Sequence, residues 1–352
     1  MKVIKDYIEI YGNVPFSVKE INEIDFAIFS TLTYLTLDEI DISNKKVPIN
    51  EVLTKFVFFV NREDFLKKGF IQKELYDFIL KLVDKKRYKD LFISNYVYKL
   101  TNNEQFGALT IHLPNRSKVI AFEGTDDNLV SWEEDLAFAN SSLAPADKDA
   151  ISYLNQMISI FDKNIYVVGH SKGGRLAITS SMYLSRFKQN KIKNIYSFDG
   201  PGLLDEEIEK KEYQRIRNKI LHYIPNYSVI GMILNHDIED IVVKGVYIDI
   251  RSHSLFKWAV KGTSFERTSI SNVSIKWHNS ANEWLKRYTP DERKAIFRQI
   301  FNTFRDLGYT GLSEIISVKN LLNIILKARK YDDDTKKILK DFFEFTIKNL
   351  VK

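Results

Sequence analysis

The segment Val168-Gly169-His170-Ser171-Lys172-Gly173-Gly174 constrains the fold more than any other part of this chain. It matches the G-x-S-x-G pattern of a nucleophile elbow, in which a strand turns sharply into a helix and presents a serine at the apex. Apolar residues 165–168 predict the strand, and the helical pattern of residues 175–184 predicts the helix. The pattern therefore predicts that Ser171 is a nucleophile with the first N–H groups of a helix beside it.

The composition is that of an ordinary globular chain of 352 residues, 44% of them hydrophobic and 28% charged. The absence of cysteine excludes disulfides, thiol catalysis and cysteine-based zinc sites. The first residues lack the apolar segment of a cleavable signal peptide. No uncharged apolar run approaches the roughly 20 residues that a membrane span needs. We therefore expect a cytoplasmic protein, or one exported without a cleavable signal peptide.

The net charge of +6 comes from the C-terminal end of the chain. Residues 286–352 contain 15 Lys and Arg against 9 Asp and Glu, so residues 1–285 are neutral overall. Basic helices can bind an anionic membrane surface, although a solvated helical face explains the same charge and is preferred. The aromatic residues there recur at helical spacing, which favours a packed core over base stacking. We expect no nucleic-acid partner.

The periodicity of the apolar residues divides the chain into three zones. Residues 1–90 are expected to form a helical N-terminal extension packed on the core, with a capping box at 17–20 in front of one helix. Residues 91–270 alternate strands and helices and are expected to form the core. Residues 271–352 are expected to form a basic helical C-terminal extension.

The central zone predicts a mostly parallel sheet covered by helices on both faces. Strands separated by helical crossovers favour this arrangement, and right-handed crossovers follow from the twist of the sheet. The expected strands are 96–100 and 105–112 as a hairpin, 118–122, 165–168, 192–198, 219–224 and 241–250. Helices are expected at 51–60 and 72–85 before the first strand, and at 147–161 and 206–217 between strands. A further helix, opened by Pro290, is expected after the last strand.

A serine nucleophile needs a general base, and the chain has six histidines. In an α/β hydrolase the acid and then the histidine follow the serine along the chain, and the histidine lies in a loop after the last main strand. His253 has this position. His278, expected at the start of a helix, is the alternative, and a plain surface role for His253 stays open. Three others are set aside. His112 comes before the serine, His170 belongs to the elbow, and His222 lies within an expected strand.

Further motifs lie beside the expected strands. They are Phe122-Glu123-Gly124-Thr125-Asp126-Asp127, Trp132-Glu133-Glu134-Asp135 and Phe198-Asp199-Gly200-Pro201-Gly202. Together with the elbow they resemble class 3 (fungal-type) lipases. More closely, they resemble an uncharacterised bacterial family of lipase-like α/β hydrolases, in which segments similar to Ile24-Asp25, 228–232 and 253–258 also recur. The resemblance covers most of the chain and implies an α/β-hydrolase fold with helical extensions.

The resemblance also implies roles for single residues. It makes Ser171 the nucleophile and His253 the general base, and it closes an oxyanion hole with the Gly124-Thr125 pair and the backbone N–H of Lys172. Attack on an ester carbonyl builds an oxyanion, which each aligned donor stabilises by about 3–4 kcal/mol. Glu123 is a departure, because class 3 lipases usually have an arginine there. Any ion pair of that arginine is therefore absent or reversed.

The acid that orients the histidine has three candidates. Class 3 lipases carry it after the strand that follows the Phe-Asp-Gly-Pro-like turn, where this chain has Asn226 and no carboxylate. Asp199, at the end of an expected buried strand one crossover after the serine, is preferred. Asp237 is the second candidate and Asn226 the third, since asparagine can orient a histidine but cannot balance its charge. A plain turn-capping role for Asp199 stays open.

No cofactor is expected, because the chain has no zinc-protease motif, P-loop or dinucleotide-binding glycine pattern. The acidic residues Asp126, Asp127, Glu133, Glu134 and Asp135 could hold Ca²⁺, but a solvated loop that caps the next helix is preferred.

These observations predict a serine carboxyl-ester hydrolase of lipase or phospholipase type, which acts through an acyl-enzyme on Ser171. Acyl lipids are favoured over small esters as substrates. Two alternatives stay open: a catalytically weak lipase-fold module used for binding or as an effector, and a thioesterase or peptidase.

Overall fold

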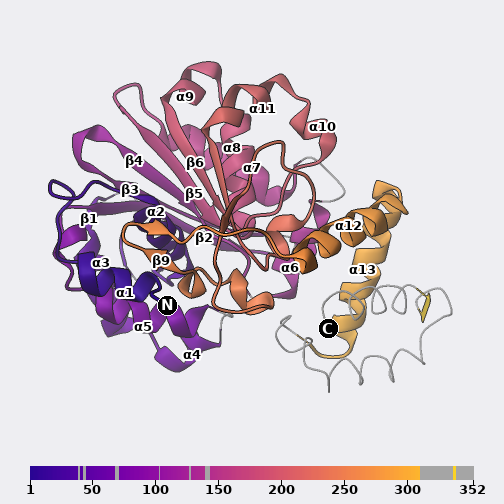
Figure 1. Ribbon diagram of the computed structural model, residues 1–352, viewed down its shortest axis with the longest axis horizontal. Coiled ribbons are helices and arrows are strands. Elements are labelled where there is room, and N and C mark those ends of the chain that lie inside the picture. The colour runs from indigo at the N-terminus through magenta and orange to yellow at the C-terminus, as the bar shows by residue number, and fades with distance from the viewer. Residues whose placement is uncertain are drawn as a thin grey trace.

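An eight-stranded sheet forms the centre of the protein in the computed structural model (Figure 1). The structure describes residues 1–38, 40–42, 45–67, 71–102, 104–126, 128–138, 143–309 and 336–337. The strands are β1 (Val47–Pro48), β2 (Phe92–Leu100), β3 (Gln105–His112), β4 (Lys118–Phe122), β5 (Ile165–His170), β6 (Ile192–Phe198), β7 (Ile220–Pro225) and β8 (Ile241–Val243).

The strands lie side by side in chain order. Neighbours from β1 to β4 are antiparallel, and neighbours from β4 to β8 are parallel. A parallel half with helical crossovers and a serine elbow after β5 is the α/β-hydrolase fold that the sequence predicts. Strands expected at 118–122 and 192–198 match β4 and β6 residue for residue, and β2 and β3 form the expected hairpin.

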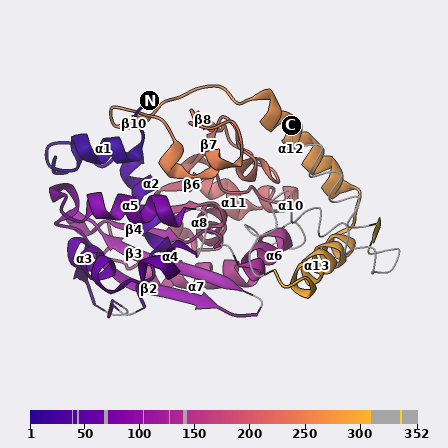
Figure 2. The same ribbon diagram turned by 90° about the horizontal axis from the view of Figure 1, so that it is seen from below.

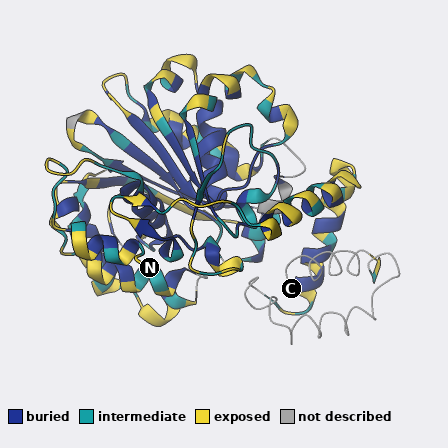
Figure 3. Cartoon of the chain, in the orientation of Figure 1, coloured by how far each residue is buried: buried dark blue, intermediate teal, exposed yellow. Residues whose placement is uncertain are grey.

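Helices cover both faces of the sheet (Figure 2). One apolar core joins one face to the N-terminal helices, and a second joins the other face to the helices between the strands. The central strands from β3 to β7 are therefore mostly buried between two layers, as the dark strands in Figure 3 show. The first layer contains α1 (Ile4–Tyr11), α2 (Glu23–Thr31), α3 (Ile49–Phe59), α4 (Arg62–Leu66) and α5 (Gln72–Leu82). The second contains α7 (Pro145–Met157), α8 (Lys172–Met182) and α11 (Lys211–Ile216). Two short helices, α9 (Arg186–Lys191) and α10 (Asp205–Ile208), come between α8 and α11 in the sequence.

A third apolar cluster joins α6 (Leu129–Ala137) to the C-terminal helices α12 (Asn272–Lys286) and α13 (Pro290–Asp306). In both views these two helices lie at the opposite end of the molecule from α1 and α3 (Figures 1 and 2). Most of the basic segment 286–352 lies outside the described residues. Within the described part of the chain, no helix is long and apolar enough to cross a membrane.

A helix was expected directly after a capping box at 17–20, and this prediction of its start is wrong. The helix α2 begins at Glu23, where the side chain of Asn22 accepts from Ile24 N–H and Asp25 accepts from Asn22 N–H. The carbonyls of Lys19 and Glu20, before this start, accept hydrogen bonds from the buried guanidinium of Arg87. The helix expected at 206–217 is divided into α10 and α11.

The prediction of a strand at 241–250 is correct only for β8, and residues 244–250 are not part of the main sheet. After β8 the chain leaves the sheet and pairs with a later segment: Lys244 N–H donates to the carbonyl of Glu266 (2.8 Å), and Val246 N–H donates to that of Lys257 (2.9 Å). That segment carries the short hairpin of β9 (Val260–Lys261) and β10 (Ser264–Phe265). Alternating apolar residues made 244–250 resemble a strand, but their partner lies outside the main sheet.

A buried ion pair fixes α2 against the rest of the N-terminal layer. The Arg87 guanidinium donates to both oxygens of Asp25, at 2.9 Å from Nε and 2.6 Å from Nη2, and both side chains are 0% exposed. The hydroxyls of Tyr88 (2.7 Å) and Tyr7 (3.2 Å) donate to Oδ1 of the same carboxylate. Arg87 also donates to the carbonyls of three residues between α1 and α2, namely Val14, Lys19 and Glu20. Every charge in this network is therefore compensated.

We expect Arg87→Ala to lower the free energy of unfolding by about 3–5 kcal/mol, because it leaves the Asp25 carboxylate buried without its counter-charge. Urea denaturation measures this loss. Lys67→Ala is the control, since Lys67 pairs with Asp64 on the surface, where both side chains are mostly exposed. Equal stability of the two variants would contradict the role given to the network.

Candidate active site

Ser171 occupies a strained turn between β5 and α8. Its backbone has φ +57° and ψ −131°, a conformation that residues other than glycine rarely adopt. The turn is held by a hydrogen bond of 2.9 Å from Ser171 N–H to the carbonyl of Phe198 in β6. A Cβ on Gly169 would lie 2.0 Å from the carbonyl oxygen of Gly173, so the turn closes only with glycine there. The strand, elbow and helix predicted from the sequence are thus present.

His253 and Asp199 are brought together by segments 54 residues apart. His253 ends a short 3-10 helix at Ile250–His253, and its Nδ1 lies 2.6 Å from Oδ2 of Asp199. Asp199 follows β6 directly, is 0% exposed and has φ +48°. Its other oxygen accepts from Ser228 Oγ (2.5 Å) and Gly231 N–H (3.1 Å). Three donors therefore fix the orientation of this carboxylate.

The other two acid candidates are engaged elsewhere. Oδ2 of Asp237 accepts from Nε of Arg217 at 2.8 Å, in a half-exposed ion pair. Oδ1 of Asn226 accepts from Gly245 N–H at 2.8 Å.

The remaining histidines have partners of their own. His278 lies inside α12 rather than at a helix start, and its Nδ1 is 2.6 Å from the carbonyl of Met232. His222 lies in β7 as expected, between Oδ1 of Asp240 at 2.8 Å and the carbonyl of Gly200 at 3.0 Å. His112 contacts Oγ of Ser94 at 2.7 Å in the β2–β3 hairpin.

His253 also lies against the residue that precedes the serine. Nε2 of His170 is 2.8 Å from the carbonyl oxygen of His253, and the two rings are 4.5 Å apart between centroids. The His253–Asp199 pair is therefore at the same end of the parallel strands as Ser171. The sequence places His170 only in the elbow and does not predict this contact.

The expected oxyanion residues lie on either side of the elbow. A Cβ on Gly124 would come within 3.1 Å of Ser171 Cβ and 2.5 Å of the carbonyl of His170, so the segment after β4 passes closely beside the serine. Thr125 follows in the same segment. Lys172 is the first residue of α8, and its backbone N–H is at the positive end of that helix.

The side chain of Lys172 points into the core and not toward the serine. Its Nζ is 2.7 Å from the carbonyl of Gln105 and 3.3 Å from Oε2 of Glu134, and both charged side chains are almost entirely buried. Glu134 also accepts from the N–H groups of Gln105 and Ala146. This ion pair ties the start of α8 to α6 and β3.

The acidic residues considered for Ca²⁺ are dispersed among separate partners. Glu134 pairs with Lys172, Glu133 with Arg305, and Asp126 accepts from Asn128 N–H at 3.0 Å. Asp127 and the side chain of Asp135 lie outside the described residues. Among the described residues no cluster of three His, Asp or Glu side chains could hold a metal ion.

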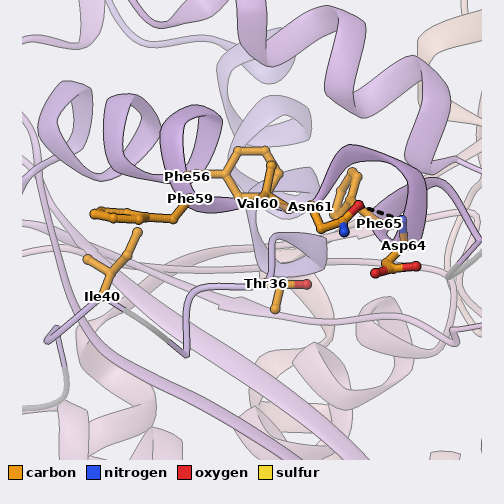
Figure 4. A pocket seen from close by; sticks show the side chains of 8 residues that line it. All are labelled: Thr36, Ile40, Phe56, Phe59, Val60, Asn61, Asp64 and Phe65. Carbon is orange, nitrogen blue, oxygen red and sulfur yellow. Dashed lines mark hydrogen bonds between the residues drawn. The ribbon is translucent and has the colours of Figure 1, made fainter.

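An apolar groove lies in the N-terminal layer, between the helices α3 and α4 and the segment that follows η1 (Leu32–Tyr34) (Figure 4). Its apolar lining residues are Ile40, Phe56, Phe59, Val60 and Phe65. Ser171, Asp199 and His253 are not among the residues that line it, so it is separate from the candidate active site.

The sequence did not reveal three residues that contact this site. Ser228 and Gly231 belong to a recurring segment to which the resemblance gives no role, and no pattern in the sequence singles out Tyr34. The Tyr34 hydroxyl lies 2.9 Å from Nδ1 of His170, although the two residues are 136 positions apart. No local pattern signals such a contact, because it depends on how the N-terminal layer packs on the sheet.

We expect the free energy of unfolding to fall as the pH falls from about 6.5 to about 4. Burial lowers the pKa of His112 to about 4 and holds those of His170 and His236 well below the ordinary 6.5. The unfolded chain therefore takes up more protons in this window than the folded protein does. Urea denaturation at about pH 7 and about pH 5 should give a lower midpoint at the lower pH, and His112→Gln should lessen the difference. An unchanged midpoint would contradict the expectation.

Comparison with known proteins adds the family to this description. The chain is similar in structure to M37 lipase, whose crystal structure is known. The match covers 59% of this chain and 68% of the lipase chain, with 16% sequence identity and a TM-score of 0.35. No curated protein matches the chain. A family model described as Mbeg1-like matches residues 82–302, which include the elbow, Asp199 and His253. Because this match spans more than half of the sequence, the chain belongs to the Mbeg1-like family.

Proposed function

We propose that this protein is a serine carboxyl-ester hydrolase that acts through an acyl-enzyme on Ser171. The observation that carries the proposal is the strained serine elbow beside a histidine whose Nδ1 is 2.6 Å from a buried carboxylate. Strained non-glycine backbone at the apex of such a turn costs about 1–3 kcal/mol and persists where the surrounding structure imposes it. A serine, a histidine and an acid in this chain order are the elements of a hydrolase triad.

The hydrogen bond to Asp199 gives His253 its role as general base. A carboxylate at Nδ1 keeps the proton on that nitrogen, so Nε2 is free to accept the proton of the Ser171 hydroxyl. Asp199 also stabilises the imidazolium that forms when Ser171 attacks the ester carbonyl. The donors Ser228 and Gly231 hold Asp199 in this orientation. Collapse of the tetrahedral intermediate passes the proton from His253 to the leaving alcohol and leaves the acyl group on Ser171. Water then gives a proton to His253 and attacks the acyl group, and the carboxylic acid leaves as Ser171 takes the proton back.

Backbone donors beside the elbow support stabilisation of the oxyanion. The N–H of Lys172 starts α8, and the Gly124-Thr125 segment passes within van der Waals reach of Ser171. Because the Lys172 ammonium is paired with Glu134 in the core, the charge at this end of the helix comes from its N–H groups. The proposed oxyanion hole is therefore built from Lys172 and Thr125, and each donor contributes about 3–4 kcal/mol to transition-state binding.

Apolar side chains leading to His253 favour an acyl lipid or phospholipid as substrate. Val246, Ile248 and Ile250 are 40%, 72% and 46% exposed, an unusual exposure for three alternating apolar residues. They precede the proposed base on the same segment, where an acyl chain could cover them.

The second candidate is a lipase-fold module with weak or no catalysis, and Glu123 is the observation that favours it. Glu123 is 5% exposed, follows β4 directly and replaces the arginine of class 3 lipases. Hydrolysis of p-nitrophenyl esters or phospholipid vesicles that is lost in both Ser171→Ala and His253→Ala would exclude this candidate. A panel of acyl-CoA and peptide substrates would reveal a thioesterase or peptidase.

A fluorophosphonate probe should label the wild-type protein and not Ser171→Ala, because the probe reacts with an activated serine and mimics the tetrahedral intermediate. Ser159→Ala, which changes a serine in the loop before β5, is the matched control and should label as the wild type does. Folded wild-type protein that the probe does not label would contradict the proposed function.

Asp199→Asn should lower ester turnover by about 10⁴-fold while the fold is retained, because an amide favours the wrong tautomer of the histidine. Asp237→Asn is the matched control and should cost little, since Asp237 pairs with Arg217 away from His253. Steady-state hydrolysis and circular dichroism measure the two effects. The reverse ranking would move the acid to Asp237.

A further inference from the structure

We propose that Tyr34 and His170 are positioning residues that hold the backbone of His253 through a directed hydrogen-bond relay. This inference rests on the proposed function, because it concerns the placement of the general base. The relay runs from the Tyr34 hydroxyl to Nδ1 of His170 (2.9 Å), and from Nε2 of His170 to the carbonyl oxygen of His253 (2.8 Å). It joins the N-terminal layer, the elbow and the His253 segment.

The direction of each hydrogen bond follows from the chemistry of its partner. A carbonyl oxygen can only accept, so Nε2 of His170 must carry a proton. A neutral imidazole has one N–H, which leaves Nδ1 as an acceptor. Tyr34 therefore donates its O–H to Nδ1. In the other tautomer of His170, the Nε2 lone pair would face the lone pairs of the His253 carbonyl, and that contact would be repulsive.

The surroundings keep the His170 ring neutral. Burial and the nearby His253 hold the pKa of His170 well below its ordinary value. The titratable groups that face the relay are Tyr34 from η1 and His253 from the 3-10 helix, with Asp199 beyond His253. The rings of His170 and His253 are 4.5 Å apart and inclined by 35°. A neutral ring at this distance does not repel the imidazolium that His253 becomes during turnover, whereas a protonated ring would.

Tyr34 also contacts the opposite side of the elbow. A Cβ on Gly124 would lie 2.0 Å from the Tyr34 hydroxyl, so this oxygen occupies the space beside the proposed oxyanion segment. Tyr34 is 5% exposed and is the last residue of η1, which directly follows α2. The helix α2 packs against β5. One residue of the N-terminal layer thus contacts both the segment after β4 and the residue before the nucleophile.

The experiment measures the rate of fluorophosphonate labelling of Ser171 in four variants of the full chain. Tyr34→Phe removes the hydroxyl that donates to His170 and should slow labelling about tenfold, the effect of a lost hydrogen bond. His170→Leu should slow labelling about a hundredfold, because it disrupts several hydrogen bonds. His170→Gln keeps an N–H near the position of Nε2 and should label about tenfold faster than His170→Leu. In the His170→Gln background, Tyr34→Phe should cost less than about twofold, because an amide has no tautomer to select.

A packing role predicts a different pattern, in which Tyr34→Phe costs the same factor in the wild type and in the His170→Gln background. That result would overturn the relay, as would a His170→Gln variant that is labelled no faster than His170→Leu. Imidazole ¹H–¹⁵N correlations give a readout that does not depend on activity: His170 should be the Nε2–H tautomer in the wild type, and a Nδ1–H ring would contradict the relay. Failure of the proposed function is distinguishable, because the wild type itself would then not be labelled.

Discussion

The register of the parallel strands is the constraint on which the rest of the site depends. Phe122 of β4 pairs with Gly169 of β5, His170 of β5 with Phe198 of β6, and Phe198 with Tyr223 of β7. The residues that follow these pairs therefore emerge in a row at one edge of the sheet. They are the Glu123-Gly124-Thr125 segment, Ser171 and Asp199, and β7 continues to Pro225 before Asn226 leaves the same edge. A shift of one strand by one residue would turn these side chains to the opposite face.

The sequence predicted those parts of the site that a local pattern encodes. The elbow is a short motif between a strand and a helix, and Asp199 ends an apolar strand, so both could be placed at the carboxyl edge of the sheet. His253 was placed from chain order alone, and the structure brings it to Asp199 although the strand expected before it ends at Val243. A loop in place of the expected strand 244–250 does not change the order of residues along the chain. The position expected for His253 therefore did not depend on that strand.

Contacts that neither a motif nor chain order indicates could not be predicted, because they depend on packing and not on periodicity. Nothing beside Tyr34 in the sequence indicates a polar partner 136 residues away. The start of α2 was misplaced for the same reason. Its true start is capped by Asn22, and the carbonyls of Lys19 and Glu20 before it accept hydrogen bonds from Arg87.

The buried ion pair and the relay lie at the two ends of one continuous element. Asp25 in the first turn of α2 is held by Arg87, and η1, which follows α2 directly, ends at Tyr34 against His170. Between them α2 packs on β5, the strand that carries the elbow. In addition, β1 adds a strand to the main sheet by pairing with β2. The segment 1–90 is therefore part of the sheet and of the surroundings of Ser171, and a chain without it would leave His170 without its donor and expose one face of the central strands.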